Sequence, residues 1–279
     1  MDLVDLYSLL QPTPTGEPGR FTLDVPDGLQ QGRGAWGGVA TGAMVSAAQQ
    51  VDPRPEMAVR TLSAQLVAPV LVGRVQLQVE LLRGGFGTTT LGIQMRDAGA
   101  AMLAHGVVVL GSARAGEAMP HGLGSLEPPA ELSAGPAGIP AVAIGPPLAP
   151  EFAVQLEWRP LRGLPYSGSA SDETLGWVRP RGAVSGVDAS VVAALADAWW
   201  VAAIVQMDRP RPVATLGFTL DLTSDPARLT RADDGTLDFL LHRGRVLAAR
   251  EGFTVETREL WTPDGDLVSW NTQTVTVIK

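Results

Sequence analysis

The sequence predicts an α+β protein in which two antiparallel sheets, each wrapped round a central helix, pack together as a pseudo-dimer within one chain. In each half, apolar residues alternate with polar ones along several segments, as in antiparallel strands with one buried face. Each half also contains one helical segment rich in small residues, which suit a helix that a sheet approaches closely. The same order of elements on both sides of a Pro/Gly-rich segment indicates an internal duplication.

The segment between the halves is residues 116–150, which contain eight Pro and six Gly. Neither a helix nor a central strand tolerates that density of Pro and Gly. We therefore expect a surface connector between an N-terminal unit, residues 1–115, and a C-terminal unit, residues 151–279. A chain of 279 residues is long enough to bury a substantial core.

The first half begins with an extended segment, residues 19–25, and continues into a helix over residues 37–50. A Pro-containing break follows this helix and ends it. Strands come next, in the first of which Val and Leu alternate with Gln and Glu. The predicted strands are residues 74–83, 88–95 and 101–111.

The second half repeats this order, with an extended segment over residues 152–161 and a helix that begins behind Asp188. Aspartate is a favourable N-cap because its carboxylate accepts hydrogen bonds from the first free N–H groups of a helix. The sequence TPDGD at 262–266 is typical of a tight turn between two strands. The predicted strands are residues 214–222, 235–244, 250–261 and 266–277.

The helix of the second half lies in an apolar run, residues 189–207, whose only ionisable side chain is Asp197. Nineteen residues could just span a bilayer. A central Asp would cost roughly 2.5–3.5 kcal/mol there, and no basic cluster flanks the run, so we expect a buried helix of a soluble protein. Asp197 then either pairs with an Arg or is kept in apolar surroundings because chemistry needs it.

Composition excludes several classes of function. The net charge is −8 and no basic run is present, which argues against nucleic acid or an anionic membrane as a partner. The absence of cysteine excludes disulfides, thiolate metal sites and a cysteine nucleophile. No metal-ligand spacing or phosphate-binding glycine pattern occurs, so we expect no cofactor. The first residues lack the pattern of a secretory signal, so we expect a cytoplasmic protein without membrane insertion.

Short segments in both halves resemble the acyl-CoA thioesterase II family of tandem, or double hot-dog, enzymes. In the first half these are WGGVATGAMVSAA (36–48), TLSAQLVAP (61–69) and VELLRGG (79–85), which are similar to the family's helix start and following strands. The resemblance implies the double hot-dog fold. It also implies an acyl-CoA substrate and a tendency to form homo-oligomers.

In the second half the family places an Asp on the helix, a Thr at the start of the next strand and a Gln on the last strand. Asp197 in LADAWW, Thr215 in VATLGF and Gln273 in GDLVSWNTQ match these positions. The flanking residues depart from the family's pattern after Thr215 and after Gln273. The internal duplication makes Ala43 the first-half equivalent of Asp197, and Gly106 or Val107 the equivalent of Gln273. The first half therefore carries neither the carboxylate nor the amide.

The resemblance implies that Asp197 activates a water molecule, which Thr215 and Gln273 hold for attack on the thioester. The oxyanion that forms needs hydrogen-bond donors, and backbone N–H groups at a helix N-terminus are suited to this. Gly37 and Gly38 could supply such donors, or could serve only in helix–sheet packing. Trp36 either shapes the mouth of the pocket or only packs.

Two other functions stay open. A hot-dog hydratase or dehydratase needs a His beside an acidic residue at the active helix, but residues 37–50 and 189–207 contain no His. We interpret His105, His121 and His242 as surface or packing residues. Trp199 and Trp200 are interpreted as core residues. The second alternative is a non-catalytic acyl-CoA-binding protein that keeps the fold without turnover.

Overall fold

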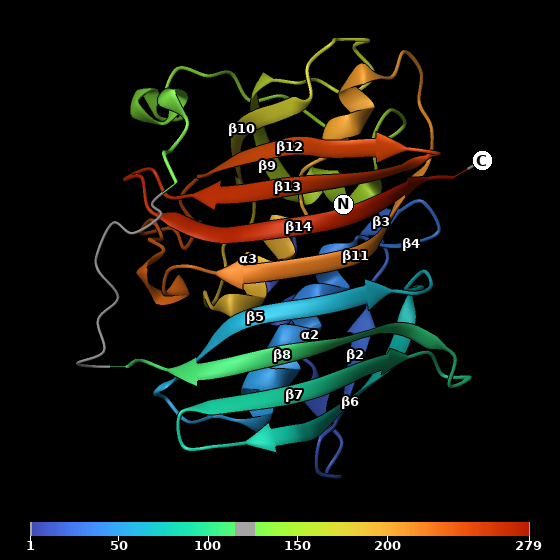
Figure 1. Cartoon of the computed structure of the whole chain (residues 1–279), viewed down its shortest axis with the longest axis vertical. Coiled ribbons are helices and arrows are strands. Elements are labelled where there is room, and N and C mark those ends of the chain that lie inside the picture. The colour runs from blue at the N-terminus through green and yellow to red at the C-terminus, as the bar shows by residue number, and fades with distance from the viewer. Residues whose placement is uncertain (1, 115–125, 279) are drawn as a thin grey trace.

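The computed structural model describes residues 2–114 and 126–278 (Figure 1). Within these ranges, twelve strands form one antiparallel sheet, and the longest helices lie against one of its faces. In spatial order the strands are β1 (Thr13–Pro14), β2 (Arg20–Val25), β6 (Gly73–Gly84), β7 (Thr88–Arg96), β8 (Met102–Ser112), β5 (Met57–Leu66), β11 (Val213–Leu222), β14 (Leu267–Val277), β13 (Phe253–Trp261), β12 (Leu240–Arg250), β10 (Glu173–Pro180) and β9 (Leu156–Arg162).

The expectation of two separate sheets is wrong, because β5 and β11 pair with each other and join the two halves. Their antiparallel register runs from Gly217 opposite Gln65 to Asp221 opposite Thr61. An unpaired strand at the edge of each half-sheet would expose a row of N–H and C=O groups, and the pairing satisfies them. The antiparallel arrangement within each half is as the alternating pattern predicts.

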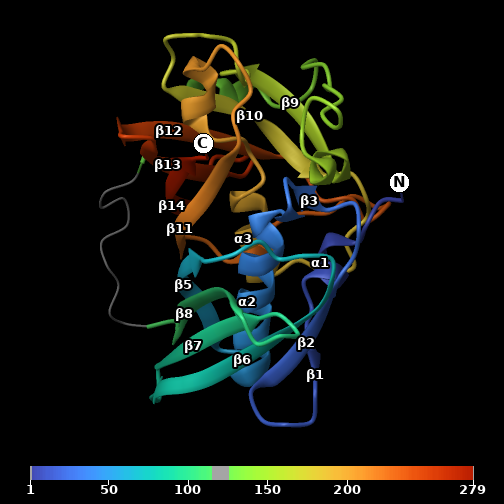
Figure 2. The same cartoon turned by 90° about the vertical axis from the view of Figure 1, so that its right-hand side faces the viewer.

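The helices α2 (Gly37–Val51) and α3 (Ala189–Ala196) lie side by side on the same face of the sheet, whose end strands curve toward them (Figure 2). The Thr41 hydroxyl donates to the carbonyl oxygen of Ala193 over 3.4 Å. A Cβ atom on Gly42 would lie 2.9 Å from the carbonyl oxygen of Ser190, so only glycine allows the helices to approach this closely. The small residues of these helices therefore serve helix–helix contact as well as helix–sheet contact.

The helix predicted over 189–207 is correct at its start and wrong in its length. Asp188 is the N-cap, and its carboxylate accepts a hydrogen bond of 2.8 Å from the N–H of Ser190. The helix stops at Ala196, and a 3-10 helix, η3 (Ala202–Gln206), follows after a short break. The N–H of Ala202 donates to the Glu256 carboxylate over 2.8 Å instead of to a helical carbonyl, which stabilises the interruption between α3 and η3. No helix in the described ranges is long and apolar enough to cross a membrane.

The strand predictions agree with the structure over most of the sheet. The main differences lie in the second half, where β12 begins only at Leu240, β10 was not predicted, and a 3-10 helix replaces the start of the segment 152–161. The remaining short elements are α1 (Leu6–Leu9), β3 (Gln30–Gln31), β4 (Gly34–Ala35), η1 (Ala130–Ala134), η2 (Glu151–Gln155) and η4 (Pro226–Arg228).

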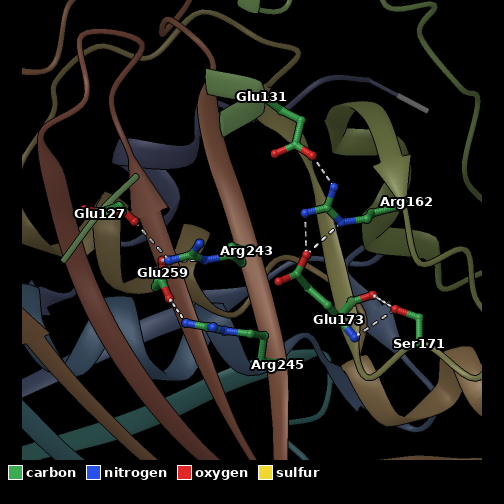
Figure 3. Close-up of polar contacts among 8 residues, drawn as sticks. All are labelled: Glu127, Glu131, Arg162, Ser171, Glu173, Arg243, Arg245 and Glu259. Atoms are coloured by element: carbon green, nitrogen blue, oxygen red, sulfur yellow. Dashed lines mark hydrogen bonds and ion pairs between the residues drawn. The ribbon is translucent and has the colours of Figure 1, made fainter. Parts of the chain in front are cut away.

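The outer face of the second half, opposite the helices, is covered by part of the Pro/Gly-rich segment. Residues 116–125 of that segment lie outside the described ranges, and Leu132 and Ile139 pack on Trp177 and Trp261 of the sheet. Figure 3 shows the ion pairs around this contact. Arg162 joins Glu131 of η1 to Glu173 of β10, and the 1 % exposed Glu259 binds Arg243 and Arg245 over 2.6 and 3.1 Å.

Candidate active site

Asp197, Thr215 and Gln273 lie together on the helix-bearing face of the sheet. The Gln273 amide donates from Nε2 to Asp197 Oδ1 over 3.0 Å, and the Thr215 hydroxyl donates to Gln273 Oε1 over 2.9 Å. Gln273 Nε2 also donates to Asn271 Oδ1 over 3.0 Å, which fixes the orientation of the amide. Asp197 Oδ1 is therefore held by the amide, and Asp197 Oδ2 points elsewhere.

The strands explain how residues far apart in sequence meet here. β11 and β14 are neighbours, and Thr215 pairs with Val275, two residues from Gln273 on the same face of β14. The register between the two strands shifts between Thr215 and Gly217, which makes Leu216 an extra residue, or β-bulge. A bulge re-aims the side chains beside it and is common next to active sites.

Asp197 itself follows the last turn of α3 rather than lying within the helix, which corrects the expectation that a central helix carries it. It occupies the C-cap position, and its carbonyl oxygen accepts a 3.1 Å hydrogen bond from the Trp36 indole. Trp36 is 1 % exposed and stacks on Phe152, so it lies in the core and not at a pocket mouth. Its indole links the end of α3 to the start of α2.

The start of α2 faces the Asp197 carboxylate. A Cβ atom on Gly37 would lie 2.6 Å from Asp197 Oδ2 and 3.1 Å from Leu66 Cδ1, so glycine is required for the carboxylate to approach. Trp36 is the N-cap of α2 and provides no side-chain capping hydrogen bond. The backbone N–H of Gly38 interacts with the Asp197 carboxylate, whereas the Asp188 carboxylate accepts hydrogen bonds from the first N–H groups of α3.

Burial governs the ionisation of Asp197, which is 7 % exposed. Loss of hydration raises its pKa from 3.8 to about 6. The positive charge of Arg258, the Gln273 amide and the backbone N–H of Gly38 act in the opposite direction, and the negative charge of Glu256 adds to the effect of burial. The result is a carboxyl group that titrates near pH 6, well above an exposed aspartate.

Arg258 and Glu256 are part of this site and were not predicted. Arg258 Nη1 lies 3.6 Å from Asp197 Oδ1, which gives Asp197 the arginine partner that one interpretation of the apolar run required. The sequence does contain a usable signal for both residues. The TPDGD turn fixes the hairpin of β13 and β14, in which Glu256 is opposite Gln273 and Arg258 is opposite Asn271.

The first half lacks polar side chains at the equivalent strand positions. Its strand β5 carries the same kind of bulge, between Val59 and Thr61, which makes Val59 the counterpart of Thr215. Continuing the same register makes Val108 the first-half equivalent of Gln273, where the sequence alone predicted Gly106 or Val107. Both valines are buried, as is Ala43 on α2.

In the described part of the chain, the remaining candidates are two histidines and two tryptophans, which are packing or surface residues. His242 is fully buried and stacks on Trp199 with 4.9 Å between ring centroids, and burial holds its pKa well below 6.5. His105 is exposed on β8, and His121 lies outside the described residues. Trp199 is 2 % exposed, as predicted for a core residue, and Trp200 is half-buried against it.

Two surface hollows lie away from these residues. One, of about 430 Å³, is next to the end of α2, and its Arg54 is bound to Asp52 through two hydrogen bonds of 2.7 Å. The other, of about 420 Å³, lies along β2 and β6. Neither hollow is lined by Asp197, Thr215 or Gln273. The polar contacts, and not the shape of the surface, identify the candidate site.

Two protein-family models match the chain. The model described as acyl-CoA thioesterase N-terminal domain matches residues 25–114, and the one described as acyl-CoA thioesterase C-terminal domain matches residues 128–277. A comparison with curated proteins gives no match.

Solved structures similar to this one include a hot-dog-fold protein from Alicyclobacillus acidocaldarius, with a TM-score of 0.80, 22 % identity and 98 % of each chain covered. The tesB protein of Mycobacterium avium subs paratuberculosis has a TM-score of 0.74 and 13 % identity, covering 99 % of this chain and 98 % of its own. Acyl-CoA thioesterase II TesB2 of Mycobacterium marinum has a TM-score of 0.71 and 16 % identity, covering 98 % of both chains. These likenesses show the hot-dog fold.

Proposed function

Because the chain belongs to the acyl-CoA thioesterase family, we propose that it hydrolyses acyl-CoA thioesters with a water molecule that Asp197 activates. The observation that supports this most directly is the hydrogen-bonded series from Thr215 through Gln273 to Asp197, at the start of α2. Three polar side chains from three elements meet there, next to the buried Arg258 and Glu256, and the equivalent strand positions of the first half carry valines.

In this mechanism Asp197 is the general base. Its Oδ1 accepts from Gln273, so Oδ2, which faces Gly37, is the oxygen available to take a proton. The Thr215 hydroxyl donates its own proton to Gln273 and can therefore accept a hydrogen bond from the water. A carboxyl group with a pKa of about 6 is ionised at neutral pH and is a stronger base than an exposed aspartate.

The reaction then proceeds through a tetrahedral intermediate. The water oxygen forms a bond to the thioester carbonyl carbon while its proton passes to Asp197. The carbonyl oxygen becomes an oxyanion, which the backbone N–H of Gly37 at the start of α2 stabilises; Gly38, whose N–H interacts with Asp197, lets the substrate approach the backbone closely. The C–S bond breaks, and the proton on Asp197 passes to the thiolate, leaving a carboxylic acid and free CoA.

The two other functions fit the site less well. For a hydratase or dehydratase, the nearest buried histidine is His242, which stacks on Trp199 and whose pKa is well below 6.5. A non-catalytic acyl-CoA binder would gain nothing from an aspartate whose pKa burial raises to about 6. The raised pKa therefore favours catalysis over binding alone.

The experiment that tests the proposal is steady-state hydrolysis of a panel of acyl-CoAs of increasing chain length. We expect release of free CoA from at least one of them, with the preferred length defining the substrate. Binding of the panel without turnover would overturn the proposal and favour an acyl-CoA-binding protein.

A further inference from the structure

A buried ion pair lies beneath Asp197 on the inner face of β13. Arg258 is 2 % exposed and Glu256 is fully buried, and Arg258 Nε donates to Glu256 Oε1 over 2.7 Å. The same arginine places Nη1 3.6 Å from Asp197 Oδ1. The three charged groups form one row, with the arginine between the two carboxylates.

Glu256 has a second contact that connects the pair to the active-site segment. Its Oε2 accepts the 2.8 Å hydrogen bond from the N–H of Ala202, the residue at which η3 begins. Glu256 therefore holds both the arginine and the backbone that leaves Asp197. Apolar residues of similar size would fill the same space without the cost of burying two charges.

We propose that Arg258 and Glu256 are positioning residues that set the ionisation of Asp197, and with it the lowest pH at which the enzyme works. This inference rests on the proposed function only for the role of Asp197 as base. The electrostatic arrangement itself is independent of the reaction.

The two residues act in opposite directions. The Arg258 guanidinium lies within a few ångströms of Asp197 and favours its charged form, so it lowers the pKa of Asp197. Glu256 disfavours the charged form by repulsion, and because it also binds Arg258, the two carboxylates share one guanidinium. The ionisation of Asp197 is the balance of these two influences against burial.

Other groups that face this site cannot substitute for the pair. From β14 come Gln273 and Asn271, which carry no charge, and from α2 comes the backbone N–H of Gly38. From β12 comes His242, which is kept neutral by burial and by the nearby Arg258. In the described part of the chain, Arg258 and Glu256 are therefore the charged side chains that influence Asp197.

The test is a titration of Asp197 in full-length variants, followed by carboxyl ¹³C NMR and by the pH dependence of kcat/KM. Glu256→Gln removes the repulsion and leaves Arg258 to Asp197, so the titration should move to lower pH. The double variant Glu256→Met, Arg258→Met removes both charges without leaving one unpaired. Its titration should move to higher pH, by about 1–3 units when the arginine's influence is lost. Arg258→Lys keeps a positive charge and should move the titration less than the double variant.

Glu259→Gln is the matched control. Glu259 lies on the same strand, is 1 % exposed and binds Arg243 and Arg245, but it faces the opposite side of the sheet. Like Glu256 it is a buried glutamate bound to arginine, but its partners are Arg243 and Arg245 rather than Arg258, the arginine that reaches Asp197. Its titration curve for Asp197 should coincide with that of the parent protein.

Opposite displacements in Glu256→Gln and in the double variant, with none in Glu259→Gln, would support the proposal. Displacement of the Asp197 titration in the same direction in Glu256→Gln and the double variant would overturn it, as would no displacement in the double variant. The NMR titration needs no turnover, so it distinguishes failure of this inference from failure of the proposed hydrolysis. A parent protein that hydrolyses no acyl-CoA but shows the opposite displacements would contradict only the proposed function.

Discussion

The carboxylate of Asp197 is buried in surroundings that on balance disfavour its charge. Its pKa in the folded protein, about 6, is above the ordinary value of 3.8, so the folded state binds the proton more tightly than the unfolded state. Below the pKa of the unfolded state, Asp197 is neutral in both states, so its burial carries no cost of burying a charge. The stability associated with it is lost as the pH rises through the folded pKa.

Asp197→Asn should separate stability from activity. At pH 8 the amide avoids a buried charge, so the free energy of unfolding should rise by up to about 3 kcal/mol, with little change near pH 4. Hydrolysis should fall by roughly two to four decades, the usual contribution of a general base. Urea unfolding at the two pH values and steady-state kinetics measure both effects. A large loss of stability at pH 8 with unchanged turnover would mean that the ion pair with Arg258 is structural, at a cost of about 3–5 kcal/mol.

The pH dependence of the parent enzyme follows from the same group. Because the base must be ionised, kcat/KM should rise with pH and level off above the pKa of about 6. Well below that value it should fall tenfold for each pH unit. A profile that stays level down to pH 4 would exclude Asp197 as the base.

Among single residues, the sequence identified Asp197, because an isolated carboxylate in an apolar run is recognisable without any knowledge of its spatial neighbours. The run itself does not identify the partners, since Arg258 and Glu256 come from a strand some sixty residues away. Their relation to Gln273 depends on a hairpin register that must be worked out from the turn. The position of Trp36 likewise depended on packing between α2 and Phe152.

The start of α2 is the element that the site depends on most closely. Gly37→Ala should reduce kcat/KM by about 10²-fold, because the new Cβ would lie 2.6 Å from Asp197 Oδ2 and displace it. Helix propensity should partly offset any loss of stability, since Ala is favoured over Gly by roughly 1 kcal/mol. Steady-state kinetics and thermal unfolding of the same preparation test both effects.

Gly42→Ala is the control on the same helix. Its Cβ would contact Leu10 and lie 2.9 Å from the carbonyl oxygen of Ser190, away from Asp197. Overpacking of this kind costs typically about 1–3 kcal/mol, so the variant should lose stability and keep its turnover per folded molecule. Loss of turnover in Gly42→Ala equal to that in Gly37→Ala would count against a specific role for the helix start.

Elements with a strong local pattern were predictable and those defined by distant contacts were not. The small-residue helix and the alternating strands of the first half follow from local sequence. The early end of α3 does not, because it depends on hydrogen bonds to Glu256 and Trp36 from elsewhere in the chain. The strand β10 was missed for a similar reason, since it is buried on both faces and lacks the alternation of a half-exposed strand.

At the scale of the whole molecule, the site draws on both halves, with α2 from the first and Asp197, Thr215 and Gln273 from the second. We propose that the units 1–115 and 151–279, the latter with its connector, assemble even when produced as two chains. Fragments 1–120 and 121–279 produced together should form a soluble complex that hydrolyses acyl-CoA. Each fragment alone should aggregate, because β5 or β11 would be left as an exposed edge strand. Size-exclusion chromatography and activity measurements test this, and turnover by the second fragment alone would contradict the shared site.

The uncapped start of α2 also limits how far this protein can be made more stable. Capping residues at a helix N-terminus contribute typically about 1 kcal/mol, and α3 has that contribution from Asp188 while α2 lacks a side-chain cap. A consensus or computational redesign would select a capping residue at position 36 and better helix formers at 37 and 38. Each of these changes would fill the space or engage the N–H groups that the proposed reaction uses. Thermostabilisation by directed evolution under selection for activity should therefore leave this turn unchanged and accumulate substitutions elsewhere.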